Sequence, residues 1–263
     1  MNNIVMCTKI KFLLVIFCVL GVFSANAQHT YPPQQALWDA DSLGTQRAVL
    51  MVNGKDKLVK AVIPWRNQHV VPEQQMIVVD SLTNQRIDPS AYVSIRKEEG
   101  VILFEAISGP GIYYVYYLPY HLGGRSKYYP DAIYLKRESS SNGEIEKADK
   151  IKSAAKVLRF DAVDSFNSND PMELIATQEE TKGLINTHSR EMYLAFPEER
   201  SFPIRMNNHL PKRWIDPRRS NNEVYGEAKR GEYYAFQIGV WPIKSDLRDV
   251  RISCSSLRTP QEQ

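Results

Sequence analysis

The clearest hydrophobic pattern in the chain covers residues 101–120, VILFEAISGPGIYYVYYLPY. Two apolar, aromatic-rich runs flank Gly109-Pro110-Gly111, and two such runs around a compact turn predict an antiparallel hairpin. Alternate residues of the second run point to opposite faces of a strand, and both sets are apolar or aromatic. Because neither face suits water, the pattern places this hairpin in the middle of a sheet that is covered on both sides.

Other short strand-like runs precede the hairpin and are separated by turn residues. The turn at 53–56, Asn-Gly-Lys-Asp, includes a glycine that can take a positive φ. Closely spaced strands without intervening helices favour a sandwich or barrel over βαβ units. The predicted fold class is therefore mainly β, an antiparallel β-sandwich with one or two short helices. These first strands are predicted at 47–53, 57–65, 76–80, 91–96 and 101–105.

Two helices are predicted after the hairpin, each beginning at a capping box. The first follows residues 141–144, Ser-Asn-Gly-Glu, with apolar residues at helical spacing from Ile145 to Ala155. The second begins at Thr177, with Glu180 three residues later, and runs towards His188. Alternating or short apolar runs predict further strands at 132–135, 156–162, 172–177 and 192–196.

Four prolines between Pro197 and Pro217 interrupt the chain and predict a connector between two domains. Strands at 231–241 and 247–253 then resemble the start of a second β domain. Two strands cannot bury a core alone, so either they join the first domain or the chain is the front part of a longer protein. The predicted division is a signal peptide at 1–27, a β-sandwich domain at 28–205, and a linker with the first strands of a truncated sandwich at 206–263.

The first 27 residues predict export. Lys9 and Lys11 precede an apolar run at 12–23, and Ala25-Asn26-Ala27 is a small-x-small cleavage site. A membrane anchor is the alternative, but a run of twelve residues is shorter than the roughly 20 that a spanning helix needs. Cys18 does not indicate a lipoprotein, because bulky Phe17 precedes it. We expect a secreted or periplasmic protein, cleaved near Ala27, with no membrane span.

Composition narrows the function classes further. The formal net charge of +3 includes the two leader lysines, so the mature chain is close to neutral. A nucleic-acid-binding surface usually shows a concentrated basic excess, and we therefore predict no nucleic-acid partner. Cys254 is the one cysteine outside the leader, so the mature chain has no internal disulfide.

No catalytic or cofactor site is predicted from motifs. The five histidines are far apart in sequence, without His-x-x-x-His or a cysteine pair, so no metal site is predicted. There is no Gly-x-Ser-x-Gly nucleophile motif. Three adjacent carboxylate pairs, at 98–99, 179–180 and 198–199, favour solvated surface, because neighbours on an extended chain point in opposite directions. We assign no catalytic residue, no metal ligand and no cofactor.

Aromatic residues next to arginine are the candidates for binding a carbohydrate. A flat ring can stack on the apolar face of a sugar while arginine bonds its hydroxyls. Core or inter-domain packing is the competing interpretation for each ring. The candidate carbohydrate-binding residues are Trp65, Arg66, Tyr128, Tyr129, Arg213 and Trp214.

A series of short segments, in order along almost the whole mature chain, carries a family resemblance. Each segment is weak alone, and their number and order make chance agreement improbable. They are Gln46-Arg47-Ala48-Val49, Ile63-Pro64-Trp65-Arg66, Pro72-Glu73, Val78-Val79-Asp80, Gly109-Pro110-Gly111, Asn167, Pro171-Met172-Glu173, Phe196-Pro197-Glu198-Glu199-Arg200, Pro203-Ile204-Arg205 and Arg230-Gly231-Glu232-Tyr233-Tyr234-Ala235-Phe236-Gln237.

Together they resemble the N-terminal β-sandwich region of exported bacterial glycoside hydrolases of the family 123 type and related uncharacterised ones. The resemblance implies that a later (β/α) barrel cuts the glycan, with an Asp-Glu pair assisting the substrate's acetamido group. No position here matches that pair. We therefore expect a noncatalytic accessory segment from a truncated gene or fragment, whose missing catalytic domain lies in the same or an adjacent reading frame. The alternatives are a stand-alone carbohydrate-binding protein with a glycan ligand, or an enzyme in its own right.

Overall fold

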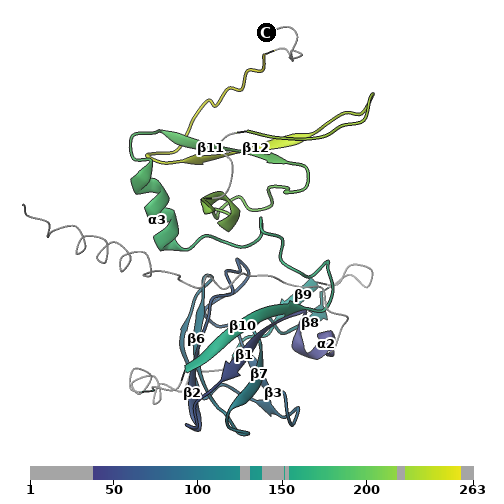
Figure 1. Ribbon diagram of the computed structural model, residues 1–263, viewed down its shortest axis with the longest axis vertical. Helices are drawn as coiled ribbons and strands as arrows, with labels where there is room; N and C mark the ends of the chain where they lie inside the picture. The colour runs from purple at the N-terminus through teal and green to yellow at the C-terminus, as the bar shows by residue number, and fades with distance from the viewer. Residues whose placement is uncertain (1–37, 125–130, 138–150, 152–153, 218–222, 256–263) are drawn as a thin grey trace, which may run out of the picture.

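The computed structural model describes residues 38–124, 131–137, 151, 154–217 and 223–255, and these form a mainly β protein with few helices (Figure 1). The mainly β class predicted from the alternating runs is therefore confirmed. The helices are α2 (Ala40–Leu43), α3 (Gln178–Thr187) and the 3-10 helix η2 (Lys212–Ile215). The strands are β1 (Gln46–Val52), β2 (Leu58–Ile63), β3 (Ile77–Asp80), β4 (Arg86–Ile87), β5 (Ala91–Ile95), β6 (Gly100–Glu105), β7 (Gly111–Tyr116), β8 (Tyr120–Gly123), β9 (Asp131–Tyr134), β10 (Ala154–Ala162), β11 (Tyr193–Glu199) and β12 (Phe236–Pro242).

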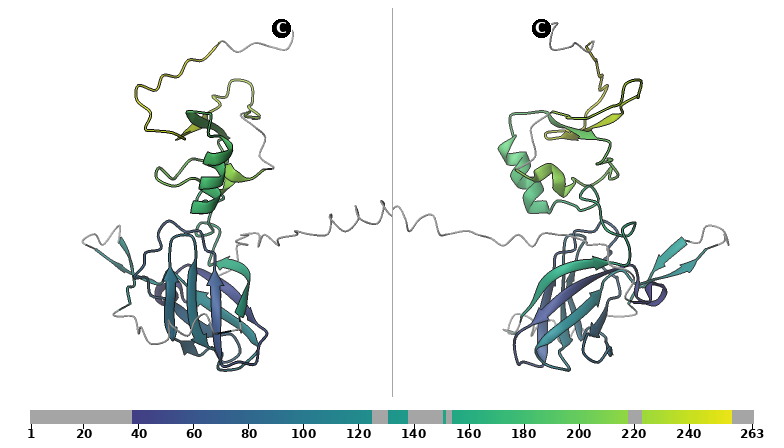
Figure 2. Two further views of the ribbon diagram at one scale, coloured as in Figure 1. Left: turned by 90° about the vertical axis from the view of Figure 1, so that its left-hand side faces the viewer. Right: turned by 45° about the vertical axis from the view of Figure 1, so that its right-hand side comes forward.

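Eight strands form one curled sheet in the order β4-β3-β7-β1-β10-β2-β6-β5. Figure 2 shows this sheet bending round on itself below the smaller part that contains α3. Its pairings are antiparallel except that between β10 and β2, where Ala154 and Ala155 pair in parallel with Lys60 and Ala61. The predicted antiparallel arrangement is thus corrected to a mixed one. A strand inserted between two antiparallel neighbours, here β1 and β2, must run parallel to one of them.

The predicted hairpin at 101–120 is wrong in its pairing, although both of its strands exist. β6 pairs with β2 and β5, whereas β7 pairs with β1 and β3. The Phe104 and Tyr113 rings still lie 5.3 Å apart, because the curl brings the two strands face to face. Gly109, with φ +72°, lets the connecting loop cross between them, and its carbonyl accepts a hydrogen bond from the Tyr113 hydroxyl.

The main core lies inside the curl. The Trp65 ring stacks on Tyr117 at 5.4 Å, and Tyr117 meets Phe160 edge-on at 6.1 Å. The Tyr92 hydroxyl on β5 accepts a hydrogen bond from the backbone N–H of Met76, next to β3. That bond joins strands from opposite ends of the sheet order, so the sheet almost closes around its core.

A second core lies beside α3 and beneath the ribbon of β11 and β12. Thr177 caps α3 as predicted, since its side chain accepts from the backbone N–H of Glu180 and the Glu180 side chain bonds back. The strand predicted at 172–177 is wrong, because Leu174 and Ile175 make only isolated bridges there. Members of this core are Met172, Ala176, Leu194, Phe196, Leu210 and Trp214. They come from both sides of the predicted boundary at 205, and the division into domains stays a prediction.

Of the two strands predicted last in the chain, one forms and the other does not. The strand expected at 231–241 forms later, as β12, which pairs antiparallel with β11 over seven positions. The strand expected at 247–253 does not form, and Asp249 takes a φ of +54° that interrupts the alternation on which the prediction depended. The first predicted helix, at 145–155, lies largely outside the described residues, although Ala155 is already in β10. The predicted signal peptide at 1–27 also lies outside them.

Candidate functional site

Trp65, a predicted sugar-stacking residue, is part of the main core. Its side chain is fully buried just after β2, and its indole N–H donates to the carbonyl of Arg96 at 2.8 Å. A Cβ on Gly100 would lie 1.9 Å from the ring, so that glycine makes the space that the ring fills. Both the ring and its polar atom are thus engaged by the protein itself. Its role in binding a glycan stays a prediction.

Trp214 and Arg213 belong to the second core. Trp214 stacks on Phe196 with 4.4 Å between ring centroids, and its indole N–H donates to Oε1 of Glu198 at 2.9 Å. Arg213 donates to the other oxygen of Glu198 and lies over the Phe202 ring at 3.5 Å. Glu198 is 2 % exposed, so this carboxylate works as a buried acceptor that joins two neighbouring residues of η2 to β11.

Arg66 joins the curled sheet to the start of α3. Its guanidinium makes a bidentate ion pair with Glu180, with the Nη2–Oε1 distance at 2.8 Å, and donates to the carbonyl of Ile175. Burial alone would raise the pKa of Glu180, but hydrogen bonds from Arg66 and the Thr177 backbone lower it overall. Glu180 is therefore an ionised structural carboxylate. The two other predicted binding residues, Tyr128 and Tyr129, lie outside the described residues.

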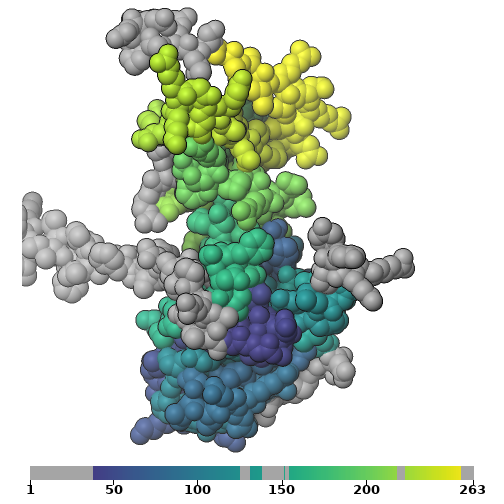
Figure 3. All heavy atoms as spheres, turned by 90° about the vertical axis from the view of Figure 1, so that its right-hand side faces the viewer, coloured from purple at the N-terminus to yellow at the C-terminus, as the bar shows by residue number. Residues whose placement is uncertain are grey.

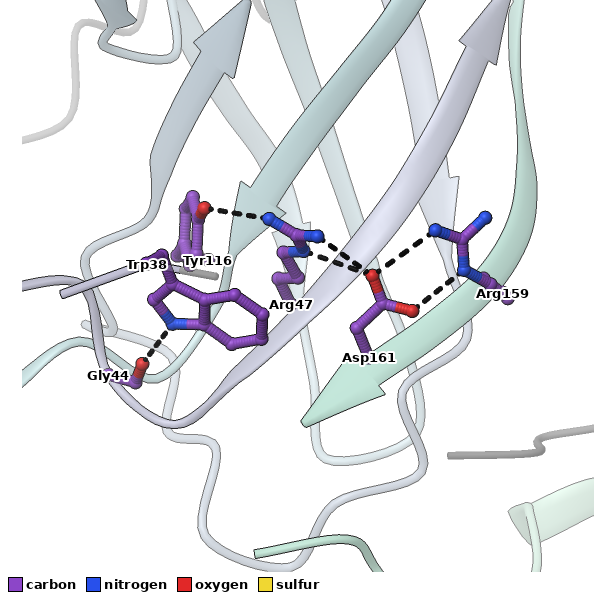
Figure 4. A network of polar contacts seen from close by, with 6 residues as sticks. All are labelled: Trp38, Gly44, Arg47, Tyr116, Arg159 and Asp161. Atoms are coloured by element: carbon purple, nitrogen blue, oxygen red, sulfur yellow. Dashed lines mark hydrogen bonds and ion pairs between the residues drawn. The ribbon is translucent and has the colours of Figure 1, made fainter. Parts of the chain in front are cut away.

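A network of ion pairs and hydrogen bonds lies on the outer face of β1 and β10 (Figure 4). Asp161 is fully buried and accepts from Nε and Nη2 of Arg47 at 3.1 and 3.0 Å. Arg159 donates to the same carboxylate, with its shorter contact, Nε to Oδ1, at 2.7 Å. One carboxylate thus accepts hydrogen bonds from two guanidinium groups, and such charge-assisted bonds are stronger than those between neutral groups.

The aromatic side chains around Arg47 complete this cover. Its guanidinium lies 4.3 Å from the Trp38 ring centroid and 3.8 Å from that of Tyr114, and it donates to the Tyr116 hydroxyl at 3.2 Å. Burial raises the pKa of Tyr116, although the hydrogen bond from Arg47 opposes that rise. Figure 3 shows the purple start of the described chain over this region, beside the teal β8 and β9. The network therefore covers part of the second face of β7, where Tyr116 is buried and Tyr114 remains partly exposed.

The described residues also form a shallow groove of about 540 Å³ on the second part of the molecule, between the end of β11 and the chain that leads into β12. We call it the Arg200 groove. Arg200 pairs with Glu232, donates to the carbonyl of Glu227, and lies over the Tyr234 ring at 5.0 Å from the centroid. The hydrogen bond between Arg200 and Glu232 raises the pKa of Arg200 and lowers that of Glu232. The groove is lined by Glu199, Arg200, Ser201, Tyr225, Gly226, Glu227 and Tyr234.

Sequence reasoning did not select this groove. The signal was available, because Tyr233-Tyr234 stand close to Arg230 and satisfy the same criterion of an aromatic ring next to an arginine. Those tyrosines were instead assigned to a strand that begins only at Phe236. The groove also needs Arg200, which is distant in sequence and reaches Tyr234 only through the fold.

The described residues contain no group of three or more His, Cys, Asp or Glu side chains arranged to hold a metal ion. Within the same part of the chain, none of the helices has the length and apolar character to cross a membrane.

Comparison with known protein families matches residues 36–163 to the family described as Glycoside hydrolase 123, N-terminal domain. This confirms the resemblance for the matched residues, which include all eight strands of the curled sheet. The second core and the Arg200 groove follow the matched range. Searches of curated proteins and of solved structures found no match.

Proposed function

We propose that this chain is a noncatalytic accessory region of an exported glycan-degrading enzyme. The match of residues 36–163 to the N-terminal domain of glycoside hydrolase family 123 supports a glycoside hydrolase-related region. Its role is to pack on a catalytic domain or to present glycan to it. The family match is the single observation that carries this proposal. The surroundings of the acidic residues and the surface of β12 give it physical support.

Three carboxylates with partners inside the protein support a structural role for the acids. Asp161 is held between two arginines, Glu180 pairs with Arg66, and Glu198 accepts from Trp214 and Arg213. A glycosidase needs one acid with a raised pKa to protonate the leaving group, together with a second free carboxylate. The oxygens of these three acids instead accept hydrogen bonds from arginine or tryptophan side chains of the protein itself.

The outer face of the β11–β12 ribbon supports a packing role. Phe236, Ile238 and Val240 alternate along β12 and are 52 %, 43 % and 36 % exposed, while Gly239 between them faces Trp214. A strand that is apolar on both faces is typical of a sheet covered on both sides. We assign this face to contact with the catalytic domain, because an exposed apolar patch marks an interaction surface.

The proposal is tested by incubating the purified chain with a panel of aryl glycosides, including N-acetylhexosaminides, and measuring the released phenol. We expect no turnover. Turnover that disappears when one acid of this chain is replaced by its amide would overturn the noncatalytic role. Export is tested separately, by N-terminal sequencing of the protein recovered outside the cytoplasm, where we expect cleavage near Ala27.

The second candidate function is a stand-alone carbohydrate-binding protein, and the Arg200 groove favours it. A glycan array probed with the unmodified chain and with Trp65→Ala and Trp214→Ala tests this second candidate. Because both rings are buried, we expect these variants to lose stability as well, so their folding is measured by circular dichroism alongside. Absence of glycan binding by the folded chain would remove this second candidate.

A further inference from the structure

The Arg200 groove combines groups that suit one class of small ligand. Its volume of about 540 Å³ lies within the range of pockets that hold small molecules. An aromatic ring, a guanidinium, a hydroxyl and carboxylates all line it, so it offers an apolar surface as well as hydrogen-bond donors and acceptors.

Its walls are held in place by contacts among the lining residues and their neighbours. Arg200 is fixed by Glu232 and by the carbonyl of Glu227, and Glu232 also accepts from the backbone N–H of Lys229 at 2.8 Å. The Tyr234 hydroxyl lies so close to Gly226 that a Cβ there would be 2.1 Å away. The glycine therefore allows the two chain segments of the groove to meet.

Tyr225 provides the free aromatic surface. It is 74 % exposed, and its hydroxyl is directed to Glu223, a residue outside the lining. Tyr234, in contrast, has Arg200 over its ring and Gly226 against its hydroxyl. The Tyr225 ring is thus the lining surface on which a ligand with an apolar face can stack.

The net charge of the lining determines whether the groove favours neutral or anionic ligands. Glu232 neutralises Arg200, and the carboxylates of Glu199 and Glu227 leave the lining with an acidic excess. Carboxylates accept hydrogen bonds from hydroxyl groups but repel other carboxylates. The groove therefore favours an uncharged, hydroxyl-rich ligand over an acidic one.

We propose that the Arg200 groove binds a neutral sugar residue, with Tyr225 stacked on its apolar face and with Glu199 and Glu227 accepting hydrogen bonds from its hydroxyl groups. The proposal rests on the proposed function only in that it takes the accessory region to be one that presents glycan. The site itself follows from the groove's own side chains. It assigns glycan contact to residues that lie after the family-matched range.

The test is calorimetric titration of the full chain with methyl β-galactoside, methyl β-N-acetylglucosaminide and methyl β-glucuronide. We expect saturable binding of a neutral glycoside and weaker binding of the glucuronide. Tyr225→Ala should weaken binding about threefold to tenfold, the range expected for loss of one aromatic stacking contact. The matched control is Tyr233→Ala, because Tyr233 is fully exposed, lies close in sequence and does not line the groove.

Glu227→Gln adds a readout that a change in folding would not mimic. It removes one negative charge from the lining, so the ratio of the affinity for the neutral glycoside to the affinity for the glucuronide should decrease. No binding of either neutral glycoside, equal effects of Tyr225→Ala and Tyr233→Ala, or tightest binding of the glucuronide would each overturn the proposal. The aryl glycoside assay reports separately on the noncatalytic role, since turnover refutes that role whatever the groove binds.

Discussion

Replacing Asp161 by Asn tests whether the ion network on the outer face of the sheet holds the fold together. The Asp161 side chain is completely buried, and the Arg47 side chain is 5 % exposed. The amide removes the charge that balances Arg47 while keeping the size of the side chain. Arg47 would then be a buried cation without its counterion, still enclosed by Trp38 and Tyr114.

Breaking a buried pair by removing one partner costs about 3–5 kcal/mol of unfolding free energy. For a chain of this size, that loss lowers the melting temperature by roughly 6–20 °C. Urea unfolding followed by far-ultraviolet circular dichroism measures it, and this signal is preferable to tryptophan fluorescence because Trp38 touches the network. Asp161→Asn should shift the midpoint strongly and leave the native spectrum unchanged.

The matched control is Lys57→Met, which breaks the pair of Lys57 with Glu105 at the surface, where the side chains are 74 % and 48 % exposed. An exposed pair of this kind contributes at most about 1 kcal/mol. A second variant, Arg47→Met with Asp161→Leu, should recover much of the lost stability, because an apolar pair no longer contains an unbalanced charge. Equal, small losses for Asp161→Asn and for the control would refute the reasoning.

Three other predictions follow from single side chains. Gly239→Ala should lower the thermal midpoint because a Cβ there would lie 2.2 Å from the Trp214 ring, whereas Gly183→Ala, in open space within α3, should stabilise the chain by about 1 kcal/mol. The pKa of Glu180 is lowered in the folded chain, so its contribution is present above the ordinary value of 4.5 and is lost as the pH falls below 4.5 towards the folded value. Glu180→Gln should therefore weaken the dependence of the unfolding free energy on pH at the acidic end of a series measured from pH 7 to 3. An unchanged dependence would contradict this assignment. Ile238→Asp, on the exposed face of β12, should change the unfolding free energy by no more than about 0.5 kcal/mol. It should also reduce self-association in light scattering, because it places a charge in the exposed apolar face.

The alternating runs located most strands within a few residues, because an apolar residue at every second position is a local property of the chain. The same is true of the α3 cap, where Thr177 and Glu180 are three residues apart and satisfy each other's backbone. Local reasoning failed where a long-range contact decided the outcome. β10 enters between β1 and β2, and this separates strands that follow each other directly in the sequence.

The candidate site shows the same limit. An aromatic ring next to an arginine indicates either a binding surface or a packed core, and the sequence alone leaves both open at Trp65 and Trp214. Their burial depends on distant partners, Gly100 and Tyr117 for the first, Phe196 and Gly239 for the second. The Arg200 groove likewise exists only where two segments about 30 residues apart come together.

Residue order was therefore enough to establish a mainly β chain, the approximate places of its strands, one helix cap and a family resemblance, since each of these depends on short-range periodicity or local motifs. Strand partners, the burial of the tryptophans and the position of the groove required the folded chain. The physical reason is that alternation defines the two faces of a strand but not its neighbours, and those neighbours decide which side chains meet water.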